Sequence, residues 1–520
     1  MRFLKKDIGI TLCLFLLFLC ITLPIYNRTS AIQDVGEYLN NPVRILHGEM
    51  PYRDFWLLMP PAEVILPAAL YKIFGISIPM LLAVNSIVSA LTGAVAFMVG
   101  RIAFARFSSA ILFSLLFFFD SALYNYAGYN HSNWFLLFLM AAAYCLIRFI
   151  NGRKDAFLVY AGAFAGLASC FRIYESAPFF IGTAATIILV PHMTIRNRLR
   201  HIVLFLASAA VMWGCIIALF FPAHYLVAIQ EIFVNSVRHA SASRGNAFGD
   251  IQGDVRGMLA HADSLWLISY YGNHLIRHSL NYLVIILSLI GGLSLLRKKD
   301  IEEQGIIIGL LIWTILSTGK MKEGIDSGIL GFAIIPAFLI IMLWIESTDE
   351  SKPKISLCMR ILTIGLIGSS LYAVGGEWAA KINKNNHEIR SLAGTIYADD
   401  ALYAKETNAV IQTIREITQP NEYIAVLHTM PYPFFAATER RNATYYDSLI
   451  DLLYRPSSAK EKIICDDILR KKAGLVVVEP SIIEKNSPLK TLRTCIEKSF
   501  SISSVYSNYL IYFPKDAYSL

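Results

Sequence analysis

Long apolar blocks alternate with short polar segments along the chain as far as residue 375. Each block is about 17 to 25 residues long, the length that an α-helix needs to cross about 30 Å of hydrocarbon. The pattern therefore predicts about eleven membrane-spanning helices. We place them at 8–26, 78–100, 107–123, 131–150, 156–172, 176–194, 201–222, 279–296, 304–319, 327–346 and 356–375. The first block has no small-residue cleavage site after it, so we interpret it as an uncleaved anchor.

Composition agrees with membrane embedding. Hydrophobic residues make up 56% of the 520-residue chain and charged residues only 16%, and the mean hydropathy is +0.52. A soluble globular protein needs more charge than this to cover its surface. The net charge of +8 is spread in short clusters between apolar blocks, which argues against nucleic acid as a partner.

The basic clusters set the orientation. They occur in alternate loops, close to the membrane, and such loops face the cytoplasm. With the N-terminus inside and an odd number of spans, residues 376–520 are expected outside. Short loops and modest length favour a bacterial inner membrane. The clusters are Arg2/Lys5/Lys6, Arg101/Arg106, Arg148/Arg153/Lys154, Arg196/Arg198/Arg200, Arg297/Lys298/Lys299 and Lys352/Lys354.

Two outer segments, 27–77 and 223–278, are long. Within the first, residues 55–74 are apolar but interrupted by Pro60, Pro61 and Pro67, so we expect re-entrant or interfacial helices rather than a span. The second mixes Gly, Ser, His and Arg, and we expect it to lie along the outer surface.

The C-terminal segment changes character. Residues 423–428 and 474–479 are short β-branched runs, 400–417 and 458–472 read as helices, and 500–513 as a closing strand or hairpin. This mixture predicts a small α/β domain, so we divide the chain into a membrane domain, 1–375, and an outer domain, 376–520. No nucleotide-binding, nucleophile-elbow or zinc-protease motif occurs in it.

Cysteines add one open question. Cys465 and Cys495 share the outer domain and either pair, if that domain faces an oxidising compartment, or remain free thiols. The other six lie in apolar segments and read as small buried hydrophobes.

Charged groups near the spans gather at the outer ends, where they are expected to pair or to line a polar cavity. Asp34 and Glu37 are three residues apart and would share one helix face. They are either a solvated first turn of a helix or part of a site. Asp54 either pairs with its neighbour Arg53 or contributes a second carboxylate, and His131 is either an interfacial residue or a substrate contact.

Three further positions carry the same ambiguity. Arg172 and Glu175 have the spacing of a structural i,i+3 pair. Lys320 and Lys322 have the position of snorkelling anchors, but as positive charge on the outer side they weaken the positive-inside bias. A phosphate-binding role explains that departure.

The order of motifs after the first span resembles the GT-C superfamily of glycosyltransferases, which includes protein O-mannosyltransferases and the lipid A aminoarabinose transferase. The residues that carry the resemblance are 33–38 (QDVGEY), 47–55 (HGEMPYRDF), 59–61 (MPP), 70–75 (LYKIFG) and the glycine-to-arginine stretch 166–172 (GLASCFR). It covers about residues 8–180, and beyond them it rests on span count and an outer C-terminal domain.

The resemblance implies transfer of a sugar from a polyprenyl-phosphate carrier to a glycan, lipid or protein acceptor on the outer face of the membrane. It implies Asp34 as the principal carboxylate, with Glu37 beside it and Asp54 as a further acid. A carboxylate accepts the proton of the attacking hydroxyl, and cations stabilise the departing phosphate. The candidates for phosphate and substrate binding are Arg172, Lys320, Lys322, Arg53, His131 and Glu175. No cofactor is required, although some relatives bind a divalent metal, Mg or Mn, which Asp34 and Glu37 would hold.

The sequence departs from the family pattern in two places. The acidic pair is Asp34-Val-Gly-Glu37 rather than adjacent or separated by one residue, and Leu58-Met59 stands where aminoarabinose transferases have Glu-Lys. Asp54 or Glu63 are the acids that would substitute. Two other functions stay open: a lipid-linked sugar flippase or transporter, and a polysaccharide polymerase or ligase.

Overall fold

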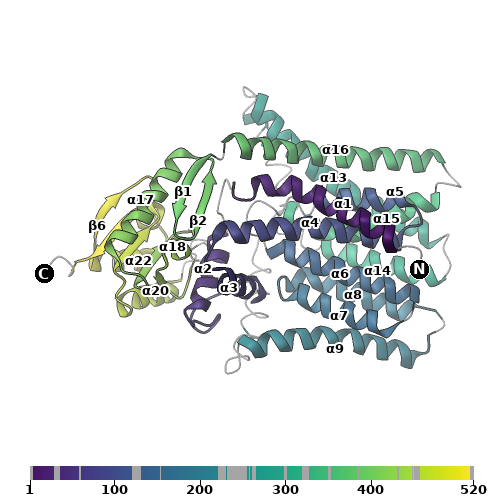
Figure 1. Ribbon diagram of the computed structural model, residues 1–520, viewed down its shortest axis with the longest axis horizontal. Coiled ribbons are helices and arrows are strands. Elements are labelled where there is room, and N and C mark those ends of the chain that lie inside the picture. Colours follow the sequence, from purple (N-terminus) through teal and green to yellow (C-terminus); the bar gives the residue numbers. More distant parts are fainter. Residues whose placement is uncertain are drawn as a thin grey trace.

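Helices occupy all of the apolar blocks in this computed structural model (Figure 1). The structure describes residues 4–28, 35–57, 60–119, 131–152, 154–191, 193–220, 230, 255–256, 258–260, 265–297, 301–318, 327–348, 353–384, 386–429, 432–447, 449, 452 and 457–515. Its helical part comprises α1 (Leu4–Thr22), η1 (Leu23–Ile25), α2 (Val35–Leu46), α3 (Ala62–Phe74), α4 (Ile78–Ala103), α5 (Phe107–Phe117), α6 (His131–Gly152), α7 (Asp155–Ser169), α8 (Ile173–Leu189), α9 (Ile195–Phe220), α13 (Leu265–Leu296), α14 (Ile301–Thr318), α15 (Ser327–Thr348) and α16 (Pro353–Lys384).

Four helical stretches within the described residues are both long and apolar enough to cross a bilayer: Lys6–Ile25, Ile78–Ala103, Ser132–Gly152 and Ile195–Ala218. Shorter apolar helices cover the other predicted spans, and the number of crossings stays a prediction. Helices α2 and α3 confirm that the segment 27–77 contains helices, and its outer location stays a prediction. Pro61 stands at the N-cap of α3, where its missing N–H costs no hydrogen bond.

Two helices differ from the predicted spans. Helix α13 begins at Leu265, within the segment expected to lie along the outer surface, and α16 continues past 375 to Lys384. In both cases a polar stretch extends an apolar helix, because only hydrocarbon length limits a span and nothing forces the helix to end at the bilayer surface.

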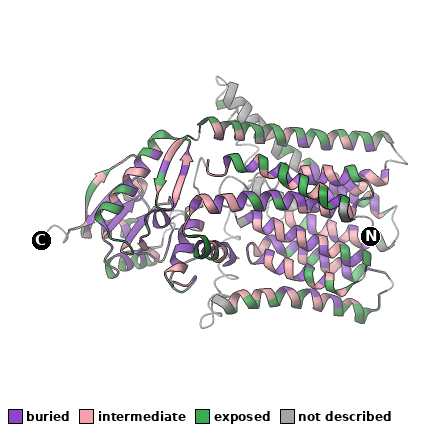
Figure 2. Ribbon diagram, in the orientation of Figure 1, coloured by how far each residue is buried: buried purple, intermediate pink, exposed green. Residues whose placement is uncertain are grey.

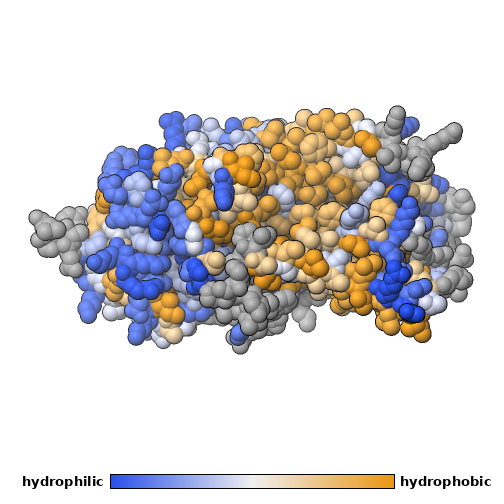
Figure 3. Space-filling view, turned by 60° about the horizontal axis from the view of Figure 1, so that its bottom comes forward, coloured by the Kyte–Doolittle hydropathy of each residue, from blue (hydrophilic) through white to orange (hydrophobic). Residues whose placement is uncertain are grey.

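The surface of the helical part is an apolar belt. Large apolar side chains such as Leu12, Ile188, Val203, Ile290 and Ile361 are half or more exposed, or nearly so. In the space-filling view this belt lies between a hydrophilic α/β part and a hydrophilic strip at the far end (Figure 3). Buried residues instead concentrate between the helices (Figure 2). An exposed apolar surface of this extent is stable only against lipid.

Close helix approach depends on small residues, as is typical within membranes. Helices α8 and α14 meet at Gly182 and Gly309, and a Cβ at Gly182 would lie 2.6 Å from the Gly309 carbonyl oxygen. A larger residue at either position would force the two helices apart.

The C-terminal part is a sheet covered by helices. Its five-stranded sheet has the order β4-β3-β5-β7-β6, with β3, β4 and β5 parallel and β7 antiparallel to both neighbours. A separate antiparallel hairpin, β1–β2, precedes it. The elements are β1 (His387–Ser391), β2 (Gly394–Ala398), α17 (Ala401–Ile417), β3 (Tyr423–Leu427), α18 (Phe434–Thr438), β4 (Arg441–Asn442), α20 (Ser458–Arg470), β5 (Leu475–Val478), α21 (Pro480–Ile483), α22 (Lys490–Ser499), β6 (Phe500–Val505) and β7 (Leu510–Pro514).

The predicted strands and helices of this part are confirmed as β3, β5, α17, α20 and the β6–β7 hairpin. Strand β5 is buried along its whole length, which explains its unbroken apolar run. The β1–β2 hairpin and the two-residue β4 were not predicted, because neither has an apolar run of its own. Cys465 of α20 and Cys495 of α22 form a disulfide.

One face of the sheet packs against the helical part. Ile424, Val426 and Val477 of the sheet share an apolar cluster with Leu39 of α2 and Leu81 of α4. Backbone hydrogen bonds reinforce this contact: the Ile78 N–H donates to the Ala393 carbonyl at 2.9 Å, and the Tyr397 N–H to the Asn27 carbonyl at 2.9 Å.

A buried guanidinium joins the first outer segment to the α/β part. Arg44, at 1% exposure, donates to the carboxylates of Glu49 at 2.7 Å and Asp447 at 2.9 Å. It also donates to the carbonyls of Thr444 at 2.9 Å and Asp54 at 3.0 Å. Its guanidinium carbon lies 4.7 Å from the centre of the Phe55 ring. We call Arg44, Glu49 and Asp447 the Arg44 cluster.

The Arg44 cluster contains two carboxylates for one guanidinium. Complete burial raises the pKa of Asp447 to about 6, against the opposing effect of Arg44, and the nearby Glu49 charge adds to the rise. Burial therefore favours the protonated form of Asp447.

This predicts a pH dependence of stability. A carboxyl whose pKa is raised on folding stabilises the fold fully below its unfolded pKa, and loses this contribution as pH rises through the folded value. Between pH 5 and 7.5 the unfolding free energy should fall by about 1 kcal/mol through this group. Thermal unfolding of the full chain in detergent across this range measures it. Asp447→Asn should flatten the slope, whereas the exposed control Asp466→Asn should keep it; equal slopes in both variants would contradict the assignment.

Candidate functional site

The candidate site lies at the end of the helical bundle that faces the α/β part (Figure 1). Here the first turn of α3 meets the turn between α7 and α8, and the Ala62 N–H donates to the Cys170 carbonyl at 3.2 Å. Helix α6 begins at the same end, because Asn133 in its first turn donates to Asn85 of α4 at 3.3 Å. The first turns of α3 and α6 and the turn between α7 and α8 thus lie close together at this end of the bundle.

Arg172 is the cation of this region. It is the N-cap of α8, with an extended backbone, and its guanidinium donates to Glu175 at 2.8 Å. The two side chains are 13% and 5% exposed, so both are largely screened from water. Sequence spacing left the pair as structural or functional, and the structure confirms the pairing. A buried, oriented guanidinium fits an oxyanion better than a mobile surface charge does.

Aromatic rings flank Arg172. Phe171 stacks parallel to Trp134 of α6 at a centroid distance of 6.3 Å and against Phe138 at 5.9 Å. Trp213 of α9 donates through its indole N–H to Ser169 at 2.6 Å. These rings pack on one another in the apolar core, where Phe171 is 3% exposed, and they hold the α7–α8 turn against α6.

Glu63 stands in the first turn of α3 and is 1% exposed. Glu63 follows Ala62 in the chain, and the Ala62 N–H binds the α7–α8 turn. The positive end of the α3 dipole favours a negative charge at this position. The sequence indicated Glu63 as a substitute acid, and its burial beside the Arg172 turn is compatible with that role.

Arg53 and Asp54 pair with each other rather than pointing toward Arg172. The Arg53 Nε lies 3.0 Å from both Asp54 oxygens, and the Met50 N–H donates to Asp54 at 2.8 Å. Burial acts to raise the pKa of Asp54, but the hydrogen bonds from Arg53 and Met50 outweigh it and hold that pKa below its usual value. A carboxylate stabilised in this way is a weak proton acceptor.

The remaining predicted residues are described incompletely. Asp34, Lys320 and Lys322 lie outside the described residues, and for Glu37 and His131 only the backbone positions, in the first turns of α2 and α6, are described. Their roles therefore stay predictions. The start of α6 lies beside the Arg172 region, and α2 joins the helical part to the α/β part.

A second polar cluster was missed by the sequence analysis. His428 follows β3 and Glu479 follows β5, and His428 Nδ1 lies 3.3 Å from the Glu479 carboxylate. Thr429 and Ser481 also donate to Glu479, at 2.6 and 2.7 Å. Burial lowers the pKa of His428, with Glu479 opposing it. The available signal was position: both residues end a predicted β-branched run. The structure pairs the two strands in parallel, and the carboxyl ends of parallel strands in open α/β sheets are where ligands bind.

No group of three or more His, Cys, Asp or Glu side chains that could hold a metal occurs among the described residues. Asp34 and the Glu37 side chain fall outside that set, so the predicted metal position is untested.

Neither a protein-family model nor a curated protein sequence matches the chain. Its fold, however, is similar to solved structures. ArnT from Cupriavidus metallidurans, solved with undecaprenyl phosphate bound, superimposes with a TM-score of 0.55 at 10% identity, over 96% of this chain and 97% of that one.

The oligosaccharyltransferase of Archaeoglobus fulgidus, solved with zinc and sulfate, gives a TM-score of 0.54 at 13% identity, over 96% of this chain and 73% of that one. The same enzyme tethered to an acceptor peptide gives 0.54 at 12% identity, over 99% and 75%. The expected resemblance is thus confirmed at the level of the fold: the chain has the GT-C fold of these membrane glycosyltransferases.

Proposed function

We propose that this protein is a glycosyltransferase that moves a sugar from a polyprenyl-phosphate carrier to an acceptor at the outer face of the membrane. The observation that carries the proposal is the fold. It matches, along nearly the whole of both chains, a transferase solved with undecaprenyl phosphate. The Arg172 region adds a largely buried, oriented cation at the end of the bundle that faces the α/β part.

The proposed reaction is an inverting displacement. Asp34 accepts the proton of the acceptor hydroxyl as that oxygen attacks the anomeric carbon, and the bond from that carbon to the lipid phosphate breaks with the electron pair leaving on the phosphate. Glu37, three residues later in the first turn of α2, supports the charge and orientation of Asp34.

Arg172 stabilises the departing phosphate, because negative charge develops there as the glycosidic bond breaks. Glu175 orients the guanidinium, and Lys320 and Lys322 supply further positive charge. His131, at the start of α6 near Trp134, contacts the sugar. The paired Arg53 and Asp54 shape the 47–55 turn instead of taking part in the chemistry, since each is committed to the other.

We further propose that residues 376–520 form an outer domain and that the protein lies in a bacterial inner membrane. The Cys465–Cys495 disulfide supports the outer location, because such bonds persist in oxidising compartments and not in the cytoplasm. The alternating basic loops support the same orientation.

A second candidate is transfer of an oligosaccharide from a lipid pyrophosphate carrier. The favouring observation is the similarity to the archaeal oligosaccharyltransferase, which is nearly as close as that to ArnT. The two candidates share the fold and differ in donor, so a comparison of donors in proteoliposomes separates them.

Asp34→Asn tests the proton acceptor. With polyprenyl-phosphate hexose or pentose in proteoliposomes, we expect kcat to fall by at least 100-fold, since an amide accepts no proton at neutral pH, with the donor KM little changed. The exposed Asp466→Asn is the matched control. Transfer at the wild-type rate in Asp34→Asn would refute the assignment.

Metal dependence is tested separately on the wild-type protein. Activity that is lost on chelation and restored with Mg²⁺ or Mn²⁺ would assign a metal to this loop.

Arg172→Gln tests phosphate stabilisation. We expect kcat/KM for the donor to fall by about 100-fold, the effect of removing one oxyanion donor, with partial activity in Arg172→Lys and a smaller loss in Glu175→Gln. Arg390→Gln, on an exposed strand of the α/β part, is the control. An unchanged rate in Arg172→Gln would remove Arg172 from the site.

Topology is tested through the disulfide. In intact cells, Cys465→Ser should make Cys495 reactive toward a membrane-impermeant maleimide, whereas the wild-type pair should react only after reduction. Labelling that requires permeabilised cells would place the α/β part in the cytoplasm.

A further inference from the structure

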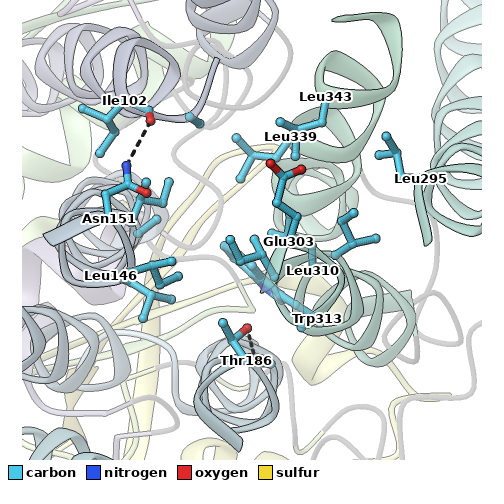
Figure 4. A pocket seen from close by; sticks show the side chains of 18 of the residues that line it. Ile102, Leu146, Asn151, Thr186, Leu295, Glu303, Leu310, Trp313, Leu339 and Leu343 are labelled. Atoms are coloured by element: carbon cyan, nitrogen blue, oxygen red, sulfur yellow. Dashed lines mark hydrogen bonds between the residues drawn. The ribbon is translucent and has the colours of Figure 1, made fainter. Parts of the chain in front are cut away.

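A large cavity lies at the opposite end of the helical bundle from the candidate site. It has a volume of about 480 Å³ and lies between α6 on one side and α8, α14 and α15 on the other, beside the end of α4 (Figure 4). Helix α4 starts against the α/β part, at Ile78, and reaches the cavity at Ile102. Along α8, the lining residues Phe179 and Thr186 stand seven and fourteen residues after Arg172, about 10 Å and about 21 Å along the helix axis, so the cavity opens away from the Arg172 region and its floor approaches that region.

The cavity has an open polar mouth and a closed apolar floor. Ala105, Asn151 and Glu303 line it and are exposed, whereas Phe179 and Trp313 line it and are buried. The two rings of the floor meet edge to face, with centroids 4.9 Å apart. Leu146, Leu310, Leu339 and Leu343 surround the space between mouth and floor (Figure 4).

The depth of the cavity corresponds to one leaflet. Glu303 at the mouth and Trp313 at the floor are ten residues apart on α14, which gives about 15 Å along the helix axis. The hydrocarbon core of a bilayer is about 30 Å thick. The part of an acyl chain that lies within one leaflet is therefore about as long as the cavity is deep. A hydrocarbon chain entering at this end would fill the cavity.

The charged side chains that line the mouth are acidic, and a basic residue stands next to them in the chain. Arg106 follows the lining residue Ala105, whereas Arg101, on the last turn of α4, is paired with Asp7 at 3.1 Å. The carboxylates of Glu303 and Glu346 line the mouth, and Glu346 accepts the backbone N–H groups of Ala105 and Arg106 at 2.9 Å. Basic residues at the ends of membrane helices bind lipid phosphates, and a carboxylate complements an ammonium group.

We propose that this cavity binds one acyl chain of a zwitterionic phospholipid from the leaflet remote from the α/β part. Its phosphate lies near Arg106 and its ammonium group near Glu303. A phospholipid fits better than the polyprenyl donor, because the mouth opens at the far end from the site where the donor phosphate is bound. The bound chain separates α6 from α14 and α15 and completes the packing between them.

Photolabelling tests the proposal. The probe is a phosphatidylethanolamine with a diazirine near the end of one acyl chain, incorporated into nanodiscs of phosphatidylethanolamine and phosphatidylglycerol with the full-length protein. Mass spectrometry should place the label on residues 143–151, 179–186 and 303–313. Leu310→Trp, which fills the cavity, should lower this labelling at least fivefold. Leu293→Trp, on the exposed side of α13 at 59% exposure, should leave it unchanged.

A second cavity-filling variant, a competitor lipid and a headgroup variant complete the test. If Leu310→Trp does not fold, Leu343→Phe fills the same space with a smaller side chain and should give the same loss. Labelling that persists in a folded, cavity-filled variant would overturn the proposal. So would efficient competition by polyprenyl phosphate, which would identify the donor tail as the occupant. Glu303→Gln should reduce labelling by the ethanolamine lipid at least twofold and leave labelling by a phosphatidylglycerol probe unchanged; equal effects on both would refute the headgroup assignment.

Discussion

The absence of water in the bilayer constrains this structure more than any single contact. A backbone N–H or C=O in hydrocarbon must be paired within its own segment, so the apolar blocks form helices and polar chemistry is displaced to their ends. The Arg172–Glu175 pair, the first turn of α3 and the start of α6 all lie at one such end. The cavity at the other end is mostly apolar for the same reason, with its charged groups at the mouth and the buried Thr183 and Thr186 among its polar lining residues.

The Arg44 cluster determines how the two parts of the chain meet. Arg44 donates to a side chain and a carbonyl from the first outer segment and to a side chain and a carbonyl from the α/β part. A buried ion pair of this kind adds little net stability but specifies one arrangement, and we infer that its role here is positional.

The protein has one polar cluster in the helical part, around Arg172, and another in the α/β part, the His428–Glu479 pair. The two differ in the ligands that they suit. The Arg172 region combines a buried cation with stacked rings, which suits an anionic lipid headgroup. The His428–Glu479 pair is held by Thr429 and Ser481 at the carboxyl edge of the sheet. We assign it no chemistry, and its multiply bonded carboxylate is consistent with a structural polar cluster.

The sequence by itself determined the apolar blocks, the helices of the first outer segment, and the strands and helices of the α/β part. It did so because hydrophobic length and periodicity act locally. The pairing of Arg53 with Asp54, and of Arg172 with Glu175, was also visible as spacing. Contacts between distant segments were not. Arg44 and Asp447 are about four hundred residues apart, and the cavity at Leu310 arises where six helices fail to fill the space between them. Only the tertiary structure decides such features, because they depend on how helices and sheet meet and not on the pattern within any one of them.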